Sequence, residues 1–330
     1  MRCMALAMRL QAEGVATCLL SIDLPGVLRN WMEERALPYF LLSGGDSWNP
    51  QFDAQQTLQA CQSIGDASVM VVDQYALDAQ WETTVRQAAE AIWVVDDLAD
   101  RRHECDVLID PGLHFSPTQR YAGLIPASAI QLLGPAYTFL RPEFDEVTSE
   151  QPRNGLVSRI LVYLGSGHGV DHEILKILAA LEDSLDHVLV EVLLGALPES
   201  GSLKELILDR FSGVVAHEHV DSVAQLMRRA DLSVGTCGLA AWERCAVGLP
   251  TLTILTADNQ QDDAHFLNDL GAIRHLGRAE SQSVEDWTSA FEWALQSPRK
   301  LLEMSRTGQE LVPGWVGVRS TIMELVLAHE

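Results

Sequence analysis

Basic residues are scarce in this sequence. It contains 23 lysines and arginines against 46 aspartates and glutamates, which gives a formal net charge of −23 at pH 7. Nucleic acids and anionic membrane surfaces attract proteins through basic faces, so this balance argues against both as partners. An anionic small molecule would have to be held by local dipoles and a few cations.

Paired cysteines and long apolar runs are missing as well. The six cysteines lie far apart with no C-x-x-C pair, so neither a disulfide framework nor a zinc site is indicated. No stretch reaches the roughly 20 apolar residues of a membrane-spanning helix. The N-terminus does not read as a signal peptide, because Gln11 and Glu13 interrupt its apolar run. We therefore expect a cytoplasmic monomer without a metal, a cofactor or a membrane contact.

The chain is long enough for two domains, with 330 residues of which 47% are hydrophobic. Predicted strands at 15–22, 38–42, 68–72, 91–95, 105–110 and 131–133 alternate with helical segments, which indicates a mainly parallel sheet. The same alternation follows from 159–164 to 251–255. Residues 147–157 are polar and contain Pro and Gly, so we place a linker there, between domains 1–146 and 158–330. The last helix, at 320–329, is predicted to pack back on the first domain.

Residues 233–261 carry the densest pattern in the chain. A β-branched run ends at Gly235, Gly238 follows, and a helix is predicted over 240–247. Its free N–H groups would favour a phosphate, and Glu243, about one turn inside, could accept two hydroxyls of a ribose. Asn259 and Gln260 bring amides back after the next strand. This pattern suggests a nucleotide site, although an ordinary α/β unit has the same succession of strand, glycine turn and helix.

Other candidate residues lie at predicted strand ends. Asp73 and Tyr75 follow one strand and Asp96 the next, at the edge where open α/β sheets build their sites; the alternative is that the carboxylates only cap the following segment. Gly165 and Ser166 begin a glycine turn that is a second candidate phosphate loop.

Arg141 is a further candidate, as a phosphate or sugar contact. An ion pair with Glu143 or Asp145 is the alternative.

Several of these stretches resemble a known family. WERCAVGLP followed by ADNQ looks like the signature of UDP-sugar enzymes of the GT-B fold, and GPAYTFLRPEF is similar to a second motif of one such family. That family is the UDP-sugar hydrolase of pseudaminic acid biosynthesis, a pathway of flagellin glycosylation, with relatives in spore coat polysaccharide gene sets. The resemblance implies an α/β, GT-B-like fold with two Rossmann-like domains facing a central cleft.

The resemblance also implies roles for residues. Glu243 would hold the uridine ribose, Asn259 and Gln260 would close on the sugar-phosphate side, and Tyr75 would be the phenol nearest the sugar. The implied reaction is attack of water on the anomeric C1 of a UDP-linked 2,4-diacetamido-2,4,6-trideoxyhexose, which releases UDP and the free sugar without a metal.

The sequence departs from the family in two places. The turn before Trp242 lacks the usual Ser or Thr, so phosphate contacts would fall on the backbone and on Thr236. The chain also opens inside the family's first helix, without the preceding strand and the G-x-G-H loop that carries the catalytic histidine. We expect a start site placed too late, and Asp73 as the base of an active chain. His168 is not taken as a replacement, because it follows a strand of the other domain.

Two alternatives from other functional classes remain open. A GT-B glycosyltransferase would use the same nucleotide half with an acceptor groove. A UDP-sugar-binding protein without activity would keep Glu243 and Asn259 while losing the chemistry of the first domain.

Overall fold

The structure is a computed structural model in which two compact units are distinguished. It describes residues 2–44, 48–114, 116–145, 153–165, 170–182, 187–195 and 200–329, without the side chains of Val27, Ser200 and Asn259. Unit 1 comprises Met1–Pro142 and Gly314–Glu330, and unit 2 comprises Glu143–Pro313. Ser166, His168 and residues 147–152 of the expected linker lie outside the described residues.

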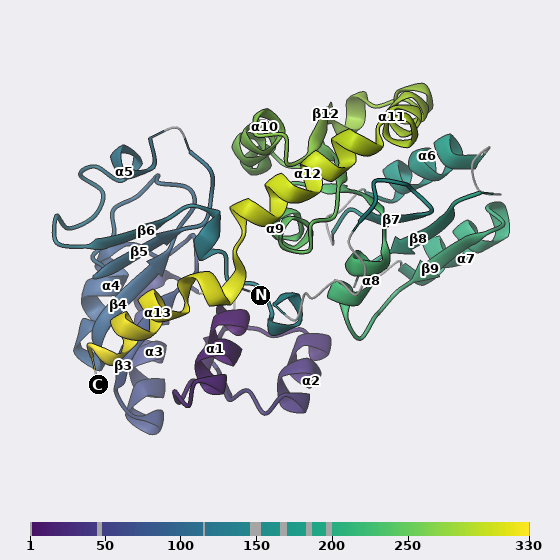
Figure 1. Cartoon of the computed structure of the whole chain (residues 1–330). Helices are drawn as coiled ribbons and strands as arrows, with labels where there is room; N and C mark the ends of the chain where they lie inside the picture. Colours follow the sequence, from purple (N-terminus) through teal and green to yellow (C-terminus); the bar gives the residue numbers. More distant parts are fainter. Residues whose placement is uncertain are drawn as a thin grey trace. The chain divides into compact units, whose positions relative to one another are not determined.

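Unit 1 alternates helices with short parallel strands (Figure 1). Its elements are α1 (Arg2–Ala12), β1 (Leu19–Ser21), α2 (Gly26–Glu34), β2 (Tyr39–Leu41), α3 (Pro50–Ile64), β3 (Ala67–Val72), α4 (Ala79–Val85), η1 (Arg86–Ala88), β4 (Ala89–Val95), β5 (Val107–Asp110), α5 (Pro117–Arg120), β6 (Ile130–Leu133), η2 (Pro135–Tyr137) and α13 (Gly314–Leu327). The strands form two separate parallel sheets, one with the order β1-β2 and one with the order β3-β4-β5-β6. The carboxyl ends of β3, β4 and β5 therefore lie at one edge of the larger sheet.

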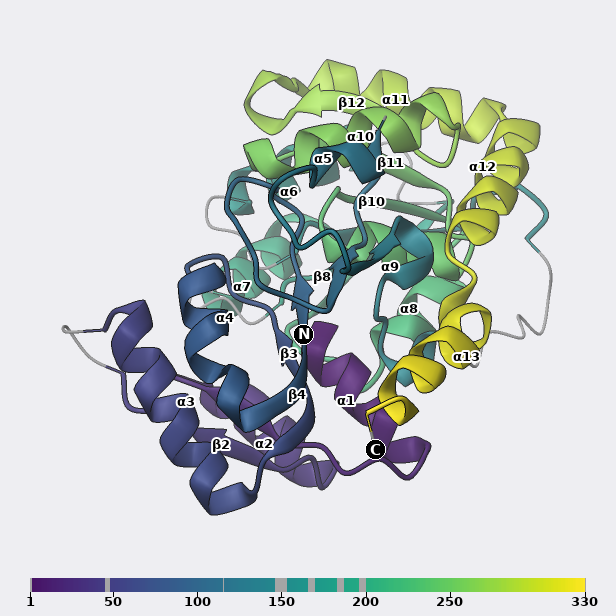
Figure 2. The same cartoon turned by 90° about the vertical axis from the view of Figure 1, so that its left-hand side faces the viewer.

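Helix α1 belongs to two apolar clusters of unit 1. Met4 and Ala7, three residues apart on one helix face, pack with the fully buried Met32 of α2. Leu6 and its neighbours on the other face pack with Trp93 of β4 and with α13. In Figure 1, α1 lies between α2 and the strands β3 and β4, and Figure 2 shows α1 beside β4 from another side. This helix thus packs against both sheets.

The terminal helix α13 begins at Gly314, earlier than the sequence predicted. Two glycines in residues 314–319 argued against a helix there. Trp315 packs on the same cluster as α1, and the Arg319 guanidinium pairs with Glu13. These tertiary contacts outweigh the weak local helix propensity.

Unit 2 is built around one continuous sheet. Its elements are β7 (Arg159–Tyr163), α6 (Asp171–Leu181), β8 (Leu189–Leu193), α7 (Ser200–Arg210), β9 (Val214–His217), α8 (Val223–Arg229), β10 (Leu232–Thr236), α9 (Leu239–Ala246), β11 (Thr251–Leu255), η5 (Asp258–Gln260), α10 (Gln261–Asp269), β12 (Arg274–Arg278), η6 (Ala279–Ser281), α11 (Val284–Gln296) and α12 (Pro298–Leu311), preceded by η3 (Pro142–Phe144) at the junction with unit 1. The strands are parallel, in the order β12-β11-β10-β7-β8-β9. Every residue of β10 and β11 is buried, so the core of this unit lies along the middle of the sheet.

Strand β12 was missed in the sequence, and helix α10 was predicted too late. β12 reads RHLGR and lies at the edge of the sheet, where charged side chains can face solvent, so it has no apolar alternation. α10 begins at Gln261 rather than at residue 265. Asp262 and Asp263 occupy its first turn, where acidic side chains suit the helix dipole.

Candidate functional site

The turn between β10 and α9 is the first candidate ligand site. Gly238 is the N-cap of α9 and offers no side chain to cap it. In the described part of the chain, the N–H groups of Gly238, Leu239 and Ala240 have no acceptor, and all three residues are partly exposed. Free N–H groups at the positive end of a helix dipole favour an anionic ligand.

The Arg244 guanidinium packs directly against Gly235. A Cβ at position 235 would lie 2.6 Å from Cζ and 2.8 Å from Nη2 of Arg244. The guanidinium also donates to the carbonyl oxygen of Thr236. The last residues of β10 and the Arg244 side chain of α9 are therefore packed tightly against each other next to the turn.

The polar loop after β11 reaches the same turn. A Cβ at Gly238 would lie 3.8 Å from Nε2 of Gln260, so this side-chain amide lies beside the N-terminus of α9. The Gln260 Oε1 accepts a hydrogen bond of 3.5 Å from the Thr256 N–H. Asn259 belongs to the same short helix, η5. The structure thus brings Gly238 and Gln260 together, although they are far apart in the sequence.

The end of β7 lies next to the end of β10. Thr236 is 6% exposed, and its hydroxyl donates to the Leu164 carbonyl at 3.4 Å. Gly165 follows with φ of +82°, a left-handed conformation that favours glycine. The predicted phosphate-loop residues Gly165 and Thr236 are therefore close along neighbouring strands.

Helix α9 packs closely against helix α12. A Cβ at Gly308 of α12 would lie 3.2 Å from Cα of Cys245, so the two helices touch through their backbones. Glu243 projects from this fixed helix and is 6% exposed. A rigid helix keeps both the open N–H groups and the Glu243 carboxylate in a defined place.

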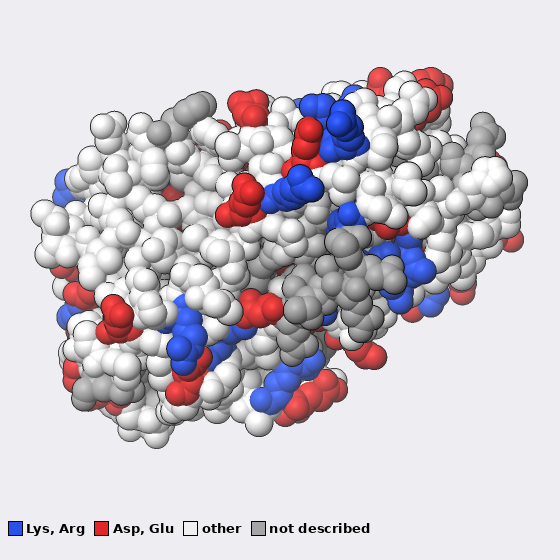
Figure 3. Space-filling view, viewed as in Figure 1, with Lys and Arg blue, Asp and Glu red and all other residues white. Residues whose placement is uncertain are grey.

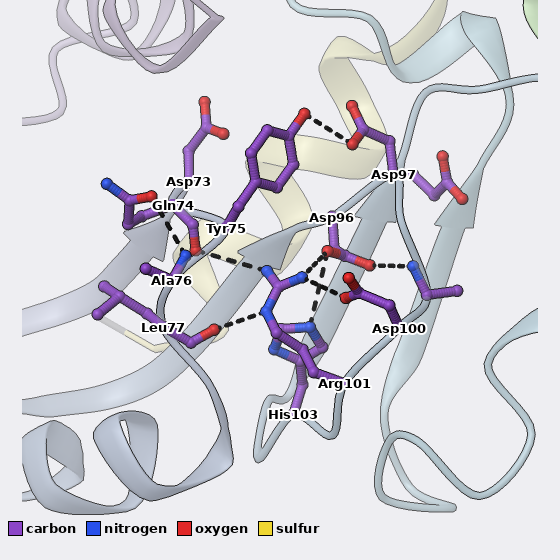
Figure 4. A network of polar contacts seen from close by, with 12 residues as sticks. Asp73, Gln74, Tyr75, Ala76, Leu77, Asp96, Asp97, Asp100, Arg101 and His103 are labelled. Carbon is purple, nitrogen blue, oxygen red and sulfur yellow. Dashed lines mark hydrogen bonds and ion pairs between the residues drawn. The ribbon is translucent and has the colours of Figure 1, made fainter. Parts of the chain in front are cut away.

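Acidic residues at the carboxyl ends of β3 and β4 form a second candidate site, in unit 1. Arg2 joins two of them: its Nη2 lies 2.8 Å from Asp73 Oδ1, and its Nη1 lies 2.9 Å from Asp97 Oδ2. The Tyr75 hydroxyl donates to Asp97 Oδ1 at 2.8 Å (Figure 4). Asp73 and Tyr75 therefore belong to one cluster, connected by Arg2 and Asp97.

The surroundings of this cluster raise the pKa values of its hydrogen-bond donors Arg2, Tyr75 and Cys3. Burial alone would lower the pKa of the Arg2 guanidinium, but the hydrogen bonds and charges of Asp73 and Asp97 raise it above its usual value. Burial raises the pKa of Tyr75 to about 12, and its bond to Asp97 acts in the same direction. Burial also raises the pKa of Cys3 to about 12, with its thiol 3.6 Å from Asp73 Oδ2. At neutral pH the phenol and the thiol are therefore protonated.

Sequence reasoning missed a buried network beside this cluster, although Asp96 was singled out. Asp96 is fully buried, its Oδ1 lies 2.7 Å from Arg101 Nη1, and its Oδ2 accepts from the Ala99 N–H at 2.8 Å (Figure 4). Below it, His103 Nδ1 lies 2.7 Å from Glu82 Oε1 and His103 Nε2 lies 3.8 Å from Asp96 Oδ1. The structure thus favours the capping role for Asp96. The basic residues that follow Asp96 in the stretch DDLADRRHE were the sequence signal that could have predicted this network.

The network shifts the pKa values of both His103 and Asp96. Burial alone would lower the pKa of His103, but its close contacts with Asp96 and Glu82 and their negative charges raise it to about 9. For Asp96, burial alone would raise the pKa, and the contact with His103, the hydrogen bond from the Ala99 N–H and the Arg101 charge hold it below its usual range. His103 is therefore a protonated partner between two carboxylates at neutral pH.

Arg141 lies at the end of unit 1. Its carbonyl oxygen accepts a hydrogen bond from Arg9 Nη2 at 3.1 Å, and its side chain is half-buried.

His217 lies in unit 2. It is half-buried, with Nε2 3.0 Å from Glu191 Oε1. Glu191 is also contacted by Arg229, so His217 belongs to a cluster of paired charges.

The described residues offer neither a metal cluster nor a membrane span. No group of three or more His, Cys, Asp or Glu side chains among them could hold a metal ion. None of their helices is sufficiently long and apolar to cross a membrane. On the face shown in Figure 3, Lys and Arg side chains alternate with Asp and Glu side chains, and the described residues there form no continuous basic patch.

Comparisons with known proteins give similarity at the level of structure. No protein-family model matches the sequence, and no curated protein does. MurG of Acinetobacter baumannii superimposes with a TM-score of 0.65 at 16% identity, over 99% of this chain and 95% of that chain. UGT71G1 of Medicago truncatula, solved in complex with UDP-glucose, gives 0.65 at 13% identity, over 99% and 95%. The spinosyn forosaminyltransferase SpnP gives 0.64 at 14% identity, over 98% and 94%.

These similarities define the fold. The chain has the α/β GT-B fold, with two Rossmann-like units that each contain parallel sheets, and the match extends over nearly the full length. The predicted fold class is confirmed.

Proposed function

We propose that this protein binds a UDP-sugar, with the nucleotide held by unit 2. The observation that carries the proposal is the open N-terminus of α9: three N–H groups without an acceptor among the described residues, with the Gln260 amide beside them. Glu243 on the same helix is the proposed acceptor for the ribose hydroxyls. Asn259, Thr236, Gly165 and Ser166 complete the proposed phosphate and sugar-phosphate contacts.

The proposed reaction is hydrolysis of the anomeric C1–O bond of a UDP-2,4-diacetamido-2,4,6-trideoxyhexose, as the sequence motifs suggest. Water attacks C1, the C1–O bond breaks, and the electron pair leaves with UDP. The developing charge on the leaving diphosphate would be stabilised by the N–H groups of α9, which are preorganised and need no rearrangement. UGT71G1, with the same fold, was solved with UDP-glucose bound, which supports a nucleotide sugar as the ligand class.

Asp73 is the proposed base for the attacking water, and Tyr75 a hydrogen-bond donor to the sugar. The phenol fits this role because its raised pKa keeps it protonated. Asp73 can accept a proton only if its ion pair with Arg2 loosens, because both carboxylate oxygens accept from the guanidinium. Arg141 is proposed as a further sugar or phosphate contact.

The Arg2–Asp73 pair favours a second candidate function. Both oxygens of Asp73 already accept hydrogen bonds from Arg2, so neither is placed to take a proton from water, and the second candidate is a chain that binds a UDP-sugar without hydrolysing it. A glycosyltransferase is distinguished by its need for an acceptor. Release of UDP in water alone, from a UDP-diacetamido sugar, therefore separates hydrolase from both alternatives.

Two substitutions test the proposal in the full chain. Glu243→Ala should weaken UDP binding by about 1–3 kcal/mol in titration calorimetry, since it leaves charged hydrogen bonds unmade. Asp73→Asn should abolish any UDP release while leaving UDP affinity unchanged. Equal UDP affinity in Glu243→Ala and wild type would remove the ribose role, and unchanged UDP release in Asp73→Asn would remove the base.

A further inference from the structure

Arg244 is a buried cation without a carboxylate partner among the described residues. Its side chain is only 1% exposed. One hydrogen bond is formed, from Nη2 to the Thr236 carbonyl, while Nε and Nη1 have no partner in the part of the chain that the structure describes. Burial lowers the pKa of Arg244, but an arginine remains charged at neutral pH.

Other arginines of unit 2 are better compensated. Arg153 donates to three carbonyl oxygens, those of Met227, Ala230 and Val247. Arg229 pairs with the buried carboxylate of Glu191. An isolated charge inside a protein is strongly unfavourable unless an opposite charge or several hydrogen bonds offset it. The charge of Glu243 acts on Arg244, but Arg244 has fewer hydrogen-bond acceptors than Arg153 and no ion pair like that of Arg229.

The guanidinium lies directly behind the candidate ligand site. It packs so closely under Gly235 that any Cβ there would clash, and it bonds to Thr236, the last residue of β10. The open N–H groups of Gly238, Leu239 and Ala240 follow at once in the chain. A full positive charge and a helix N-terminus thus converge on one turn.

We propose that Arg244 is the built-in counter-charge for a diphosphate bound at the β10–α9 turn. The inference rests on the proposed function and specifies its charged group. A helix N-terminus supplies about half a positive charge, which suits a single anionic oxygen. Arg244 adds a positive charge beneath the turn, which offsets the Glu243 carboxylate of the same helix and favours a ligand with more than one negative charge, such as a diphosphate. The guanidinium is buried and does not touch the ligand, so Arg244 is a positioning residue that acts through the field and shape of the turn.

Arg244→Met tests the counter-charge, because methionine fills a similar apolar volume without charge. Thermal melts without ligand are combined with calorimetric titrations of pyrophosphate, UDP and uridine. We expect the unliganded variant to melt at the wild-type temperature or above, since an uncompensated charge has been removed. Its affinity for UDP and pyrophosphate should fall about tenfold or more, whereas uridine binding should not change, because only the charged ligands sense the field.

Two further variants control for shape. Arg244→Lys keeps the charge and should keep the UDP affinity within about threefold of wild type, since Coulomb attraction depends on the charge and not on the planar group. Arg153→Met removes a buried arginine away from the turn, so it should lower the melting temperature and leave UDP affinity unchanged.

The outcomes separate the two levels of the proposal. A less stable Arg244→Met protein with wild-type UDP affinity would make Arg244 a structural residue and overturn the counter-charge. Equal losses for uridine and UDP would mean that the turn has collapsed, with the same consequence. If Arg244→Met does not fold, a large loss of UDP affinity in a folded Arg244→Lys overturns the inference. Failure of the wild-type chain to bind UDP or pyrophosphate would instead refute the proposed function itself.

Discussion

In unit 2, β7 lies in the middle of the sheet between β10 and β8, whereas the described residues of unit 1 contain no strand between β3 and β1. One parallel strand inserted there would give unit 1 the order β2-β1-new-β3-β4-β5-β6. The first six positions of this order correspond to β9-β8-β7-β10-β11-β12 of unit 2, β6 has no counterpart there, and α1 would correspond to α6, the helix after β7. Among the described residues, unit 2 thus has one continuous sheet where unit 1 has two.

Burial differs accordingly. β10 is buried throughout, while β3, which reads ASVMVV, is only half-buried at every residue except Val72. β1 is half-buried along its whole length. Apolar strands at a sheet edge are a liability, because their free N–H and C=O groups can pair with other chains. In unit 1, α1 packs against residues of both sheets and so links them.

The largest expected effect follows from this role of α1. Leu6 is 2% exposed and packs with β4 and α13, so Leu6→Ala should destabilise unit 1 by about 2–5 kcal/mol through lost burial and a cavity. UDP affinity, assigned to unit 2, should be retained below the melting temperature of unit 1. Chemical denaturation and UDP titration would measure the two effects.

Leu178→Ala in α6 is the matched control, since Leu178 is fully buried in unit 2. Its cost should be smaller than that of Leu6→Ala, because the strands around it remain hydrogen-bonded to one another. A larger cost for Leu178→Ala would show that α1 has no special role in unit 1.

The next largest effect concerns pH. The pKa of His103 in unit 1 is raised to about 9, so its stabilisation is complete below the unfolded value of 6.5 and is lost as the pH rises to about 9. We expect unit 1 to lose about 1–3 kcal/mol across this window. His275 in unit 2 behaves oppositely: burial and the charge of His265 lower its pKa, so its contribution is lost as the pH falls below 6.5.

Denaturant melts between pH 6 and 9.5 measure this dependence. His103→Gln should flatten it, and the exposed His187→Gln should not. An unchanged alkaline slope in His103→Gln would contradict the assignment.

Some of this organisation could be predicted from the sequence, and the reasons are local. The glycines and β-branched residues around 233–238 predict a strand, a turn and a helix, and the structure has β10, the turn and α9 there. Residues far apart in the chain were not predictable: His103 meets Glu82 only through the packing of α4 on the sheet. A charged residue on a predicted helix is normally expected at the surface. The burial of Arg244 beside Gly235 could therefore be found only from the structure.

A smaller effect is expected from adding a strand between β1 and β3. An extension ahead of Met1 that repeats residues 159–170, the strand and loop at the matching position of unit 2, could pair with β3 and β1. Arg2 contacts Asp73 at the carboxyl end of β3, which is where such a parallel strand would end. We expect the melting temperature of unit 1 to rise by about 2–6 °C, because two strand edges gain hydrogen bonds.

The same extension with a proline in the middle of the strand is the control, because proline cannot donate to the sheet. Equal melting temperatures for the two extended chains would exclude pairing with the strand edges.

Hydrogen–deuterium exchange of the full chain, with and without UDP, tests the central claim most directly. The claim is that the nucleotide binds at the α9 N-terminus of unit 2, whose sheet is continuous, while the described strands of unit 1 form two separate sheets. We predict that UDP slows exchange in residues 235–243 and 256–261, and that β1 and β3 exchange faster than β7 and β10 in both states. Protection by UDP that spares residues 235–243, or a β3 as slow as β10, would contradict it.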